Sequence, residues 1–144
     1  MVMKINYVEN KNGKLFSFHR HDFKENTDSS DNYIFIDGGI GEGYTRYSGD
    51  LKQGEIKDLM SEIREQFVWG QNYNEKNERL PETIYKPLKD LTTSHISGII
   101  RHLLEHGFAI NSENGLYYSG KARIAILLIF TYELENRLKD EMER

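Results

Sequence analysis

The chain between residues 16 and 47 gathers cationic, imidazole, acidic and aromatic side chains within short, strand-like stretches. The candidate ligand-binding residues there are His19, Arg20, His21, Asp22, Asp37, Tyr44, Arg46 and Tyr47. A guanidinium can bind a phosphate through paired hydrogen bonds, and an aromatic face offers a surface for a base, so these types suit a phosphorylated, base-bearing ligand. The alternative is a two-faced sheet whose charged side chains simply face water.

Three further candidates lie outside this cluster. Trp69 offers a stacking face, while Arg101 and Arg123 add positive charge near the helices expected below. Trp69, the only tryptophan, also suits a purely structural role as an anchor in the core or in an interface. Taken together, these residues favour a small nucleotide-like ligand over a polymer.

No catalytic motif is complete. Residues 19–22 have the His-x-His-Asp pattern of a metallo-hydrolase, but Phe23 stands where that motif has another histidine. His102 and His106 have i, i+4 spacing without the glutamate of the zinc metalloprotease motif. There is no nucleophile elbow and no cysteine. We therefore predict a binding protein that is not an enzyme, with no cofactor and no metal, and keep a metal-dependent phosphodiesterase as a less favoured alternative.

Composition narrows the class of protein. The 144 residues are 38% hydrophobic, enough for one domain with a core. A net charge of −4 argues against duplex nucleic acid as a partner, because such binding uses many contacts of Lys and Arg with phosphates. The longest apolar run, residues 124–130, is far shorter than the ~20 residues that cross a membrane. The N-terminus lacks the apolar core of a signal peptide, so we expect a cytoplasmic protein.

Alternating polarity predicts an antiparallel sheet in the N-terminal part. Asn12-Gly13 is the strongest hairpin signal, because both residues accept positive φ. The glycines between residues 38 and 43 complete neither a P-loop nor a Rossmann fingerprint, so we assign them to a tight strand connection. The expected elements are strands at 4–8, 14–21, 33–36 and 44–47, with a polar loop at 25–32, in one sheet over about 3–48.

Helical periodicity dominates the remainder. An apolar stripe predicts a helix over about 54–69, ending at Gly70 as a C-cap. A second helix at 93–106 begins with Thr92, Thr93 or Ser94 as its cap. The other expected elements are a polar excursion at 71–79, an extended segment at 80–87, a small hairpin near 108–118 and a third helix at 121–141. We therefore expect a single α+β domain, with sheet mainly in 1–50 and helices in 51–144.

The third helix begins with an almost wholly apolar stretch at residues 124–130. A helix that is apolar all round must be covered on every side. In a domain of this size we expect a second subunit to supply part of that cover, so the sequence predicts a homo-oligomer.

Several stretches in fixed order resemble small proteins of tailed bacteriophages. They are RHDF at 20–23, FIDGG at 35–39, YTRYSG at 44–49 and KPLKDLTTSHISGII at 86–100. The resemblance covers about residues 15–104. Within that group, an N-terminal antiparallel sheet followed by helices is similar to the Thoeris anti-defence sponges.

That resemblance implies a function and a place of action. The sponges bind glycocyclic ADP-ribose signals, and some bind cyclic oligonucleotides, without cleaving them. They use aromatic and arginine stacking on the base, in pockets formed by oligomer assembly. The expectation is therefore a phage anti-defence protein that sequesters a cyclic nucleotide signal in the host cell cytoplasm. A protein–protein inhibitor of a host defence enzyme, like an anti-CRISPR protein, is the alternative.

Overall fold

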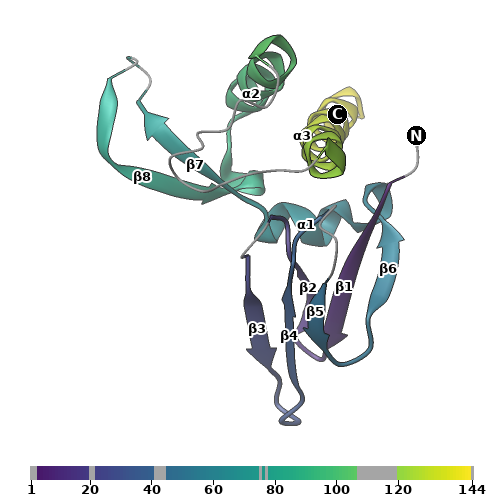
Figure 1. The fold of residues 1–144 in the computed structure, drawn as a ribbon. Coiled ribbons are helices and arrows are strands. Elements are labelled where there is room, and N and C mark those ends of the chain that lie inside the picture. Colours follow the sequence, from purple (N-terminus) through teal and green to yellow (C-terminus); the bar gives the residue numbers. More distant parts are fainter. Residues whose placement is uncertain are drawn as a thin grey trace.

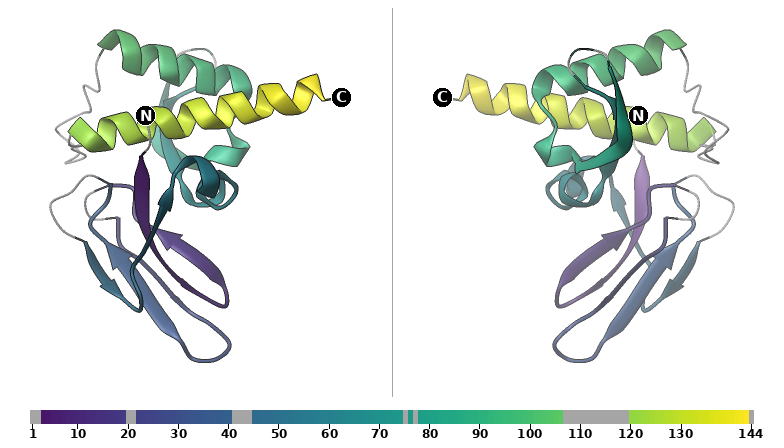
Figure 2. Two further views of the ribbon diagram at one scale, coloured as in Figure 1. Left: turned by 90° about the vertical axis from the view of Figure 1, so that its right-hand side faces the viewer. Right: turned by 90° about the vertical axis from the view of Figure 1, so that its left-hand side faces the viewer.

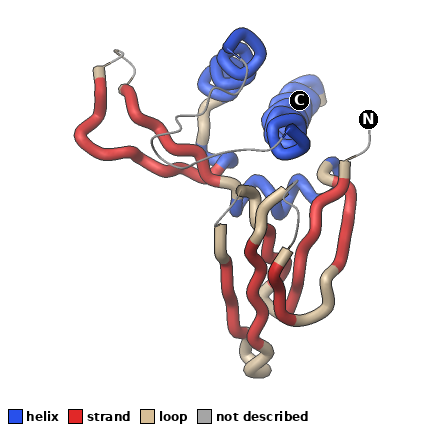
Figure 3. The backbone as a smooth tube through the Cα atoms, viewed as in Figure 1, coloured by secondary structure: helices blue, strands red, loops and turns tan. Residues whose placement is uncertain are grey.

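The fold places two small β-sheets face to face below a layer of helices, with a β-hairpin projecting to one side (Figure 1). The computed structural model describes residues 3–19, 22–40, 45–74, 76, 78–106 and 120–143. Figure 2 shows the helices lying across the upper ends of the sheets, and Figure 3 shows strands only below them and in the hairpin. The α+β class predicted from the sequence is confirmed.

The first sheet contains the predicted N-terminal hairpin. Its order is β2 (Gly13–Phe16), β1 (Lys4–Asn10) and β6 (Lys52–Glu55), all antiparallel. Asn10 pairs with Gly13, so the turn is Lys11-Asn12 and the positive φ falls on Gly13, at +125°. The predicted second strand, 14–21, is too long, because a turn described below begins after Phe16.

The second sheet corrects two predictions. Its order is β3 (Lys24–Thr27), β4 (Tyr33–Asp37) and β5 (Arg46–Ser48), again antiparallel. The prediction of a loop over 25–32 is wrong in its first part, since the backbone of Lys24–Thr27 pairs with β4. The prediction of a single sheet is also wrong, because a small core of Val8, Ile34 and Ile36, with Leu15 against it, separates two sheets.

The predicted helix at 54–69 is shorter at both ends. Gly54 belongs to β6, where it pairs with Ile5 of β1. A 3-10 turn, η1 (Lys57–Leu59), leads into α1 (Met60–Gln66), and Phe67 is already extended. Gly70 is therefore no C-cap but part of strand β7 (Val68–Tyr73). The β-branched and aromatic residues that begin β7 favour a strand over a further helical turn.

Strand β8 (Arg79–Pro87) confirms the extended segment predicted there. It pairs with β7, so residues 71–73 form a strand rather than the predicted polar excursion. A second 3-10 turn, η2 (Leu88–Asp90), returns the chain to the body. The β7–β8 pair is a sheet of its own.

Two long helices complete the upper layer, as predicted. They are α2 (Thr93–His106) and α3 (Gly120–Met142). The hydroxyl of Thr92 accepts a hydrogen bond from the backbone N–H of His95 at 3.2 Å, so Thr92 is the cap of α2. The hairpin predicted near 108–118 lies outside the described residues.

A chain of aromatic rings joins the sheets to the helices through the main core. Phe18 meets Phe67 edge to face with ring centroids 5.1 Å apart, and Phe67 meets Phe130 of α3 at 5.4 Å. Trp69 packs edge to face on the same Phe130 at 5.2 Å. Edge-to-face packing is a favoured arrangement of aromatic rings, so these contacts tie α3 to the turn after β2 and to β7.

The apolar beginning of α3 is covered mostly by its own chain. Ala125, Ile126, Ile129 and Phe130 are buried, and Ile124 is 42% exposed. Because α1 and α2 both contact α3, this helix needs no second subunit to cover most of its apolar surface. A homo-oligomer therefore stays a prediction. Among the described residues, no helix is long and apolar enough to cross a membrane.

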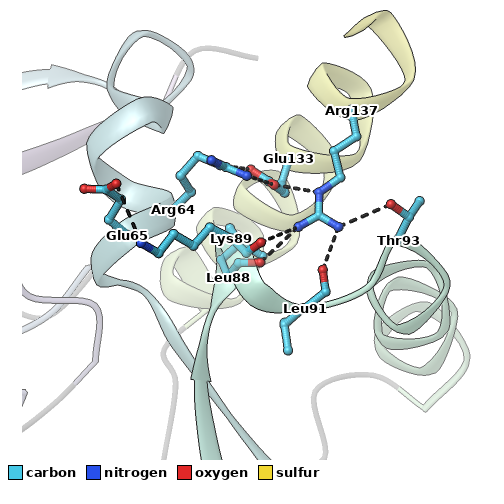
Figure 4. Close-up of polar contacts among 8 residues, drawn as sticks. All are labelled: Arg64, Glu65, Leu88, Lys89, Leu91, Thr93, Glu133 and Arg137. Atoms are coloured by element: carbon cyan, nitrogen blue, oxygen red, sulfur yellow. Dashed lines mark hydrogen bonds and ion pairs between the residues drawn. The ribbon is translucent and has the colours of Figure 1, made fainter. Parts of the chain in front are cut away.

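Glu133 of α3 is a buried acid held between two arginines (Figure 4). Arg64 of α1 donates hydrogen bonds to it from Nε at 2.9 Å and from Nη2 at 3.0 Å, and Arg137 donates from Nε at 2.7 Å. Arg137 also donates to the backbone carbonyls of Leu91 and Leu88, at 2.6 Å and 3.1 Å. This network fixes α3 against α1 and against the turn before α2.

Gly98 in the middle of α2 offers a simple test of the helix. It is exposed, and a Cβ added there would have no heavy atom of the described residues within 4 Å. Gly98→Ala should raise the free energy of unfolding by about 0.5–1 kcal/mol, because alanine loses less backbone entropy in a helix. A denaturant titration measures the change, and a loss of stability would contradict a helix at this position.

Candidate functional site

One end of the second sheet brings together several of the predicted ligand-binding residues. In β4 and β5, Asp37 is the direct cross-strand partner of Arg46. On the other side of β4, Lys24 at the start of β3 pairs with Ile36. Because neighbouring strands are antiparallel, the first residues of β3 and β5 lie beside the last residues of β4. Asp22, Asp37, Arg46 and Tyr47 therefore belong to one edge of the fold.

Asp22 closes the turn that follows Phe16. Its Oδ2 accepts a hydrogen bond from the Phe18 N–H at 2.8 Å, and its own N–H donates to the His19 carbonyl at 3.1 Å. The Ser17 hydroxyl donates to the Asp22 carbonyl at 2.7 Å. The Asp22 carboxylate therefore holds the backbone of this turn, which sets the position of His19.

Gly39 lies directly against that turn. Its N–H donates to the Ser17 hydroxyl at 3.0 Å, and its φ is +73°. A Cβ added to Gly39 would lie 2.5 Å from the His19 carbonyl carbon, so only glycine fits here. The assignment of Gly38 and Gly39 to a tight strand connection therefore agrees with the structure, whereas Gly41 and Gly43 lie outside the described residues.

Lys24 is half-buried beneath the same edge, and its Nζ atom is buried. Its Nζ lies 4.3 Å from the centre of the Phe18 ring and 3.7 Å from Asp22 Oδ2. Burial lowers the pKa of Lys24, and the Asp22 carboxylate offsets this only in part. Its cross-strand partner Ile36 is buried, so the Lys24 side chain points toward the interior between the sheets.

A small cavity opens between the two sheets at this end, with a volume of about 60 Å³. Lys4, Ser17, Gly39 and Thr45 are among the residues that line it. Pockets that enclose drug-sized ligands measure about 300–1,000 Å³. This cavity has room for water-sized groups, so it cannot enclose a nucleotide.

The outer face of the second sheet carries a row of aromatic side chains. Phe23 stacks on Phe35 with ring centroids 5.6 Å apart, and Tyr33 lies 6.1 Å from Phe35 on the other side. Phe23 is 46% exposed and Tyr33 is 44% exposed. The Tyr33 hydroxyl donates to Glu25 Oε2 at 3.0 Å, which fixes the ring. We call Phe23, Tyr33 and Phe35 the aromatic row.

Asp37 and Arg46 stand at one end of the aromatic row. Tyr33, Phe35 and Asp37 alternate along β4, so their side chains share a face, and Arg46 joins it as the partner of Asp37. Arg46 is exposed. The Oδ1 atom of Asp37 is buried and accepts no hydrogen bond within the described part of the chain.

This arrangement offers three kinds of contact side by side. Aromatic faces stack on bases, and a guanidinium donates paired hydrogen bonds to a phosphate. Asp37 shares this face with Arg46, and a carboxylate is a hydrogen-bond acceptor for a ligand hydroxyl. The outer face of β3, β4 and β5 can therefore hold a flat, hydroxylated anion.

The other predicted site residues lie on different elements or cannot be placed. Trp69 is in β7, not at a helix end, and its packing on Phe130 gives it the structural role weighed above. Arg101 is exposed on α2, and Arg123 is half-buried on α3. Arg20, His21 and Tyr44 lie outside the described residues.

The aromatic row itself was not predicted as part of the site. One signal was present, since Tyr33, Phe35 and Asp37 fall at alternate positions of a predicted strand. Phe23 gave none, because it precedes a stretch that was expected to be a loop. Among the residues described, no group of three or more His, Asp or Glu side chains is arranged to hold a metal ion.

Comparison with protein-family models, with curated proteins and with solved structures finds no match for this chain. The resemblance to small phage proteins and to the Thoeris anti-defence sponges therefore stays a prediction.

Proposed function

We propose that this chain is a phage anti-defence protein that binds a cyclic nucleotide signal, such as glycocyclic ADP-ribose, and holds it without cleavage. The observation that carries the proposal is the exposed aromatic row ending at the Asp37–Arg46 pair. The base stacks on Phe35 and a neighbouring ring, Arg46 binds the pyrophosphate, and Asp37 accepts a hydrogen bond from a ribose hydroxyl.

The structural role of Asp22 favours binding without cleavage. General acid–base cleavage needs groups that are free to exchange protons with the ligand. Asp22 already accepts a hydrogen bond from the Phe18 N–H and lies 3.7 Å from Lys24 Nζ. Glu25, on the same face, accepts a hydrogen bond from the Tyr33 hydroxyl. Asp37 by itself serves to orient a ligand.

An open sheet face covers only one side of a base. The described cavity of about 60 Å³ is too small to enclose the ligand, so a second surface must close over the aromatic row. A second copy of the chain is the partner that the sequence predicts, which would place the ligand between subunits.

The mode of action can be tested directly. The protein is incubated with glycocyclic ADP-ribose and filtered, and both fractions are analysed before and after heat denaturation. Intact signal that is recovered only after heating supports sequestration. Altered signal would instead mean the metal-dependent phosphodiesterase. Signal that stays free throughout would contradict the proposal and favour the protein–protein inhibitor.

The site itself is tested by substitution. Arg46→Ala should weaken binding about ten- to a hundredfold, the effect of losing a hydrogen bond to a charged group worth about 1.5–3 kcal/mol. Phe35→Leu should weaken it by a similar factor, because a stacked base is worth about 1–3 kcal/mol. Asp37→Asn should have a smaller effect than Arg46→Ala. Calorimetric titration gives the affinities.

Arg79→Ala is the matched control, since it removes an exposed arginine from β8 rather than from the aromatic row. It should leave the affinity unchanged. If Arg46→Ala and Phe35→Leu remain folded and bind as tightly as the control, the ligand does not lie on this face.

A further inference from the structure

The β7–β8 hairpin has a long strand edge that pairs with no strand in the described part of the chain. Figure 1 shows it projecting from the body, with β8 along its outer margin. Residues 81–86 of β8 are all exposed, including Tyr85 at 65% and Ile84 at 45%. A two-stranded hairpin is only marginally stable by itself, and an exposed edge strand is a template for pairing with another chain. The edge of β8 is therefore a candidate surface for pairing with another chain.

The direction of the β8 backbone groups follows from one hydrogen bond. The Leu88 N–H donates to the Phe67 carbonyl at 2.8 Å, so Leu88 faces the β7 side. Residues of an antiparallel strand alternate between facing the partner and facing away, and β8 pairs regularly with β7 from Pro87 to Ile84. Tyr85 therefore directs its N–H and C=O groups to the open edge. The register of the β7–β8 pairing shifts beyond Ile84, between Gln71 and Tyr73. Thr83 still shares the orientation of Tyr85, because the side chains of both lie against Gly70. Pro87 falls on the same side, where its missing N–H leaves no bond unmade.

These outward groups are complementary to a second copy of the same strand. If two β8 strands run antiparallel with Ile84 on the two-fold axis, Thr83 of each faces Tyr85 of the other. Each of these two pairs can exchange two backbone hydrogen bonds. Pro81 then lies opposite Pro87, so residues without an N–H meet at both ends and limit the pairing to the segment between them.

The charged residues of β8 favour this register over the two neighbouring registers. With Ile84 on the axis, Glu82 lies opposite Lys86 twice. Opposite charges that face each other across strands are stabilising. Centring the pairing on Thr83 or on Tyr85 would instead place Glu82 or Lys86 opposite Ile84 and form neither ion pair.

We propose that β8 pairs with β8 of a second copy about Ile84, and that the two hairpins form one four-stranded antiparallel sheet. The same surface serves both subunits, as in other two-fold dimers. The pairing is independent of the ligand proposed above, so its test uses the protein alone.

Charge reversal tests both the seam and its register. Wild type should sediment as a dimer, and Glu82→Lys and Lys86→Glu should each weaken the dimer about tenfold or more, because each places like charges opposite one another twice. An equimolar mixture of the two variants should form a heterodimer about as tight as the wild-type dimer, since every facing pair is then opposite in charge. Sedimentation gives the affinities, and native mass spectrometry identifies the heterodimer by mass.

Lys57→Glu is the control, because it reverses an exposed lysine of η1, away from β8. It should leave the dimer intact, and circular dichroism should show all variants folded. A wild type that stays monomeric at every concentration would overturn the proposal. A dimer that both charge reversals leave unchanged would also overturn it, and would place the seam elsewhere.

Discussion

Glu133→Gln is expected to lower the free energy of unfolding by about 3 kcal/mol, which is a drop in melting temperature of about 10 °C. Glu133 is 1% exposed and accepts three hydrogen bonds from Arg64 and Arg137. A glutamine keeps the shape but removes the charge, and it turns an N–H donor toward arginine donors. Removing one partner of a buried ion pair typically costs about 3–5 kcal/mol. We expect the lower end because the Arg64 side chain is 38% exposed and can reach water.

Glu135→Gln is the matched control, because it makes the same change at an exposed position of α3. Its effect should stay within about 0.5 kcal/mol in denaturant titrations. If both variants are equally stable, the network in Figure 4 adds no net stability.

The loss caused by Glu133→Gln should also depend on pH. Burial by itself raises the pKa of Glu133, but hydrogen bonds and charges from Arg64 and Arg137 outweigh it, so the pKa is lower than usual. A carboxyl with a lowered folded-state pKa stabilises the fold above its unfolded-state pKa, and loses that contribution as the pH falls through the folded-state value. The difference between wild type and variant should therefore be full near neutral pH and shrink below about pH 4.

Gly39→Ala is expected to destabilise the protein by a comparable amount, on the order of 3 kcal/mol. The left-handed φ of +73° costs a residue with a Cβ about 1–3 kcal/mol. The new methyl group would lie 2.5 Å from the His19 carbonyl carbon, and relieving such an overlap typically costs about 1–3 kcal/mol. Because the methyl group would contact the backbone of His19, rotating a side chain cannot relieve the overlap.

Gly13→Ala separates the cost of backbone strain from the cost of the steric overlap. Its φ is +125°, also unsuited to alanine, but an added Cβ would meet no heavy atom within 4 Å among the residues that the structure describes. Gly13→Ala should therefore cost the strain alone and unfold at a higher denaturant concentration than Gly39→Ala. Equal midpoints for the two variants would mean that the contact between Gly39 and His19 is not tight.

The sequence predicts those elements whose signal is local. The α2 helix has a Thr92 cap and a continuous apolar stripe, and both lie within its own residues. Lys24–Thr27 has little strand propensity and becomes β3 only because β4 offers it a partner, which no local pattern records. The same holds for Gly54, which joined an apparent helix but belongs to β6.

The sequence predicts the charged residues of the candidate site but not its aromatic row. Asp37 and Arg46 flank a connection between two expected strands, so their proximity follows from the hairpin, and their direct pairing agrees with it. Phe23 joins the aromatic row only because β3 pairs with β4, and no local sequence pattern predicts β3. Trp69 was expected near a helix end, but the strand that begins at Val68 turns it toward Phe130.

The position of α3 in the chain has a consequence for synthesis on the ribosome. Phe67, Phe18 and Ile63 are buried, yet the ring that packs on Phe67 belongs to Phe130, more than sixty residues later. Chains emerge from the N-terminus at about 5–20 residues per second. For several seconds, therefore, the nascent protein presents this aromatic surface to its surroundings, where chaperones or a second nascent copy can occupy it before α3 arrives.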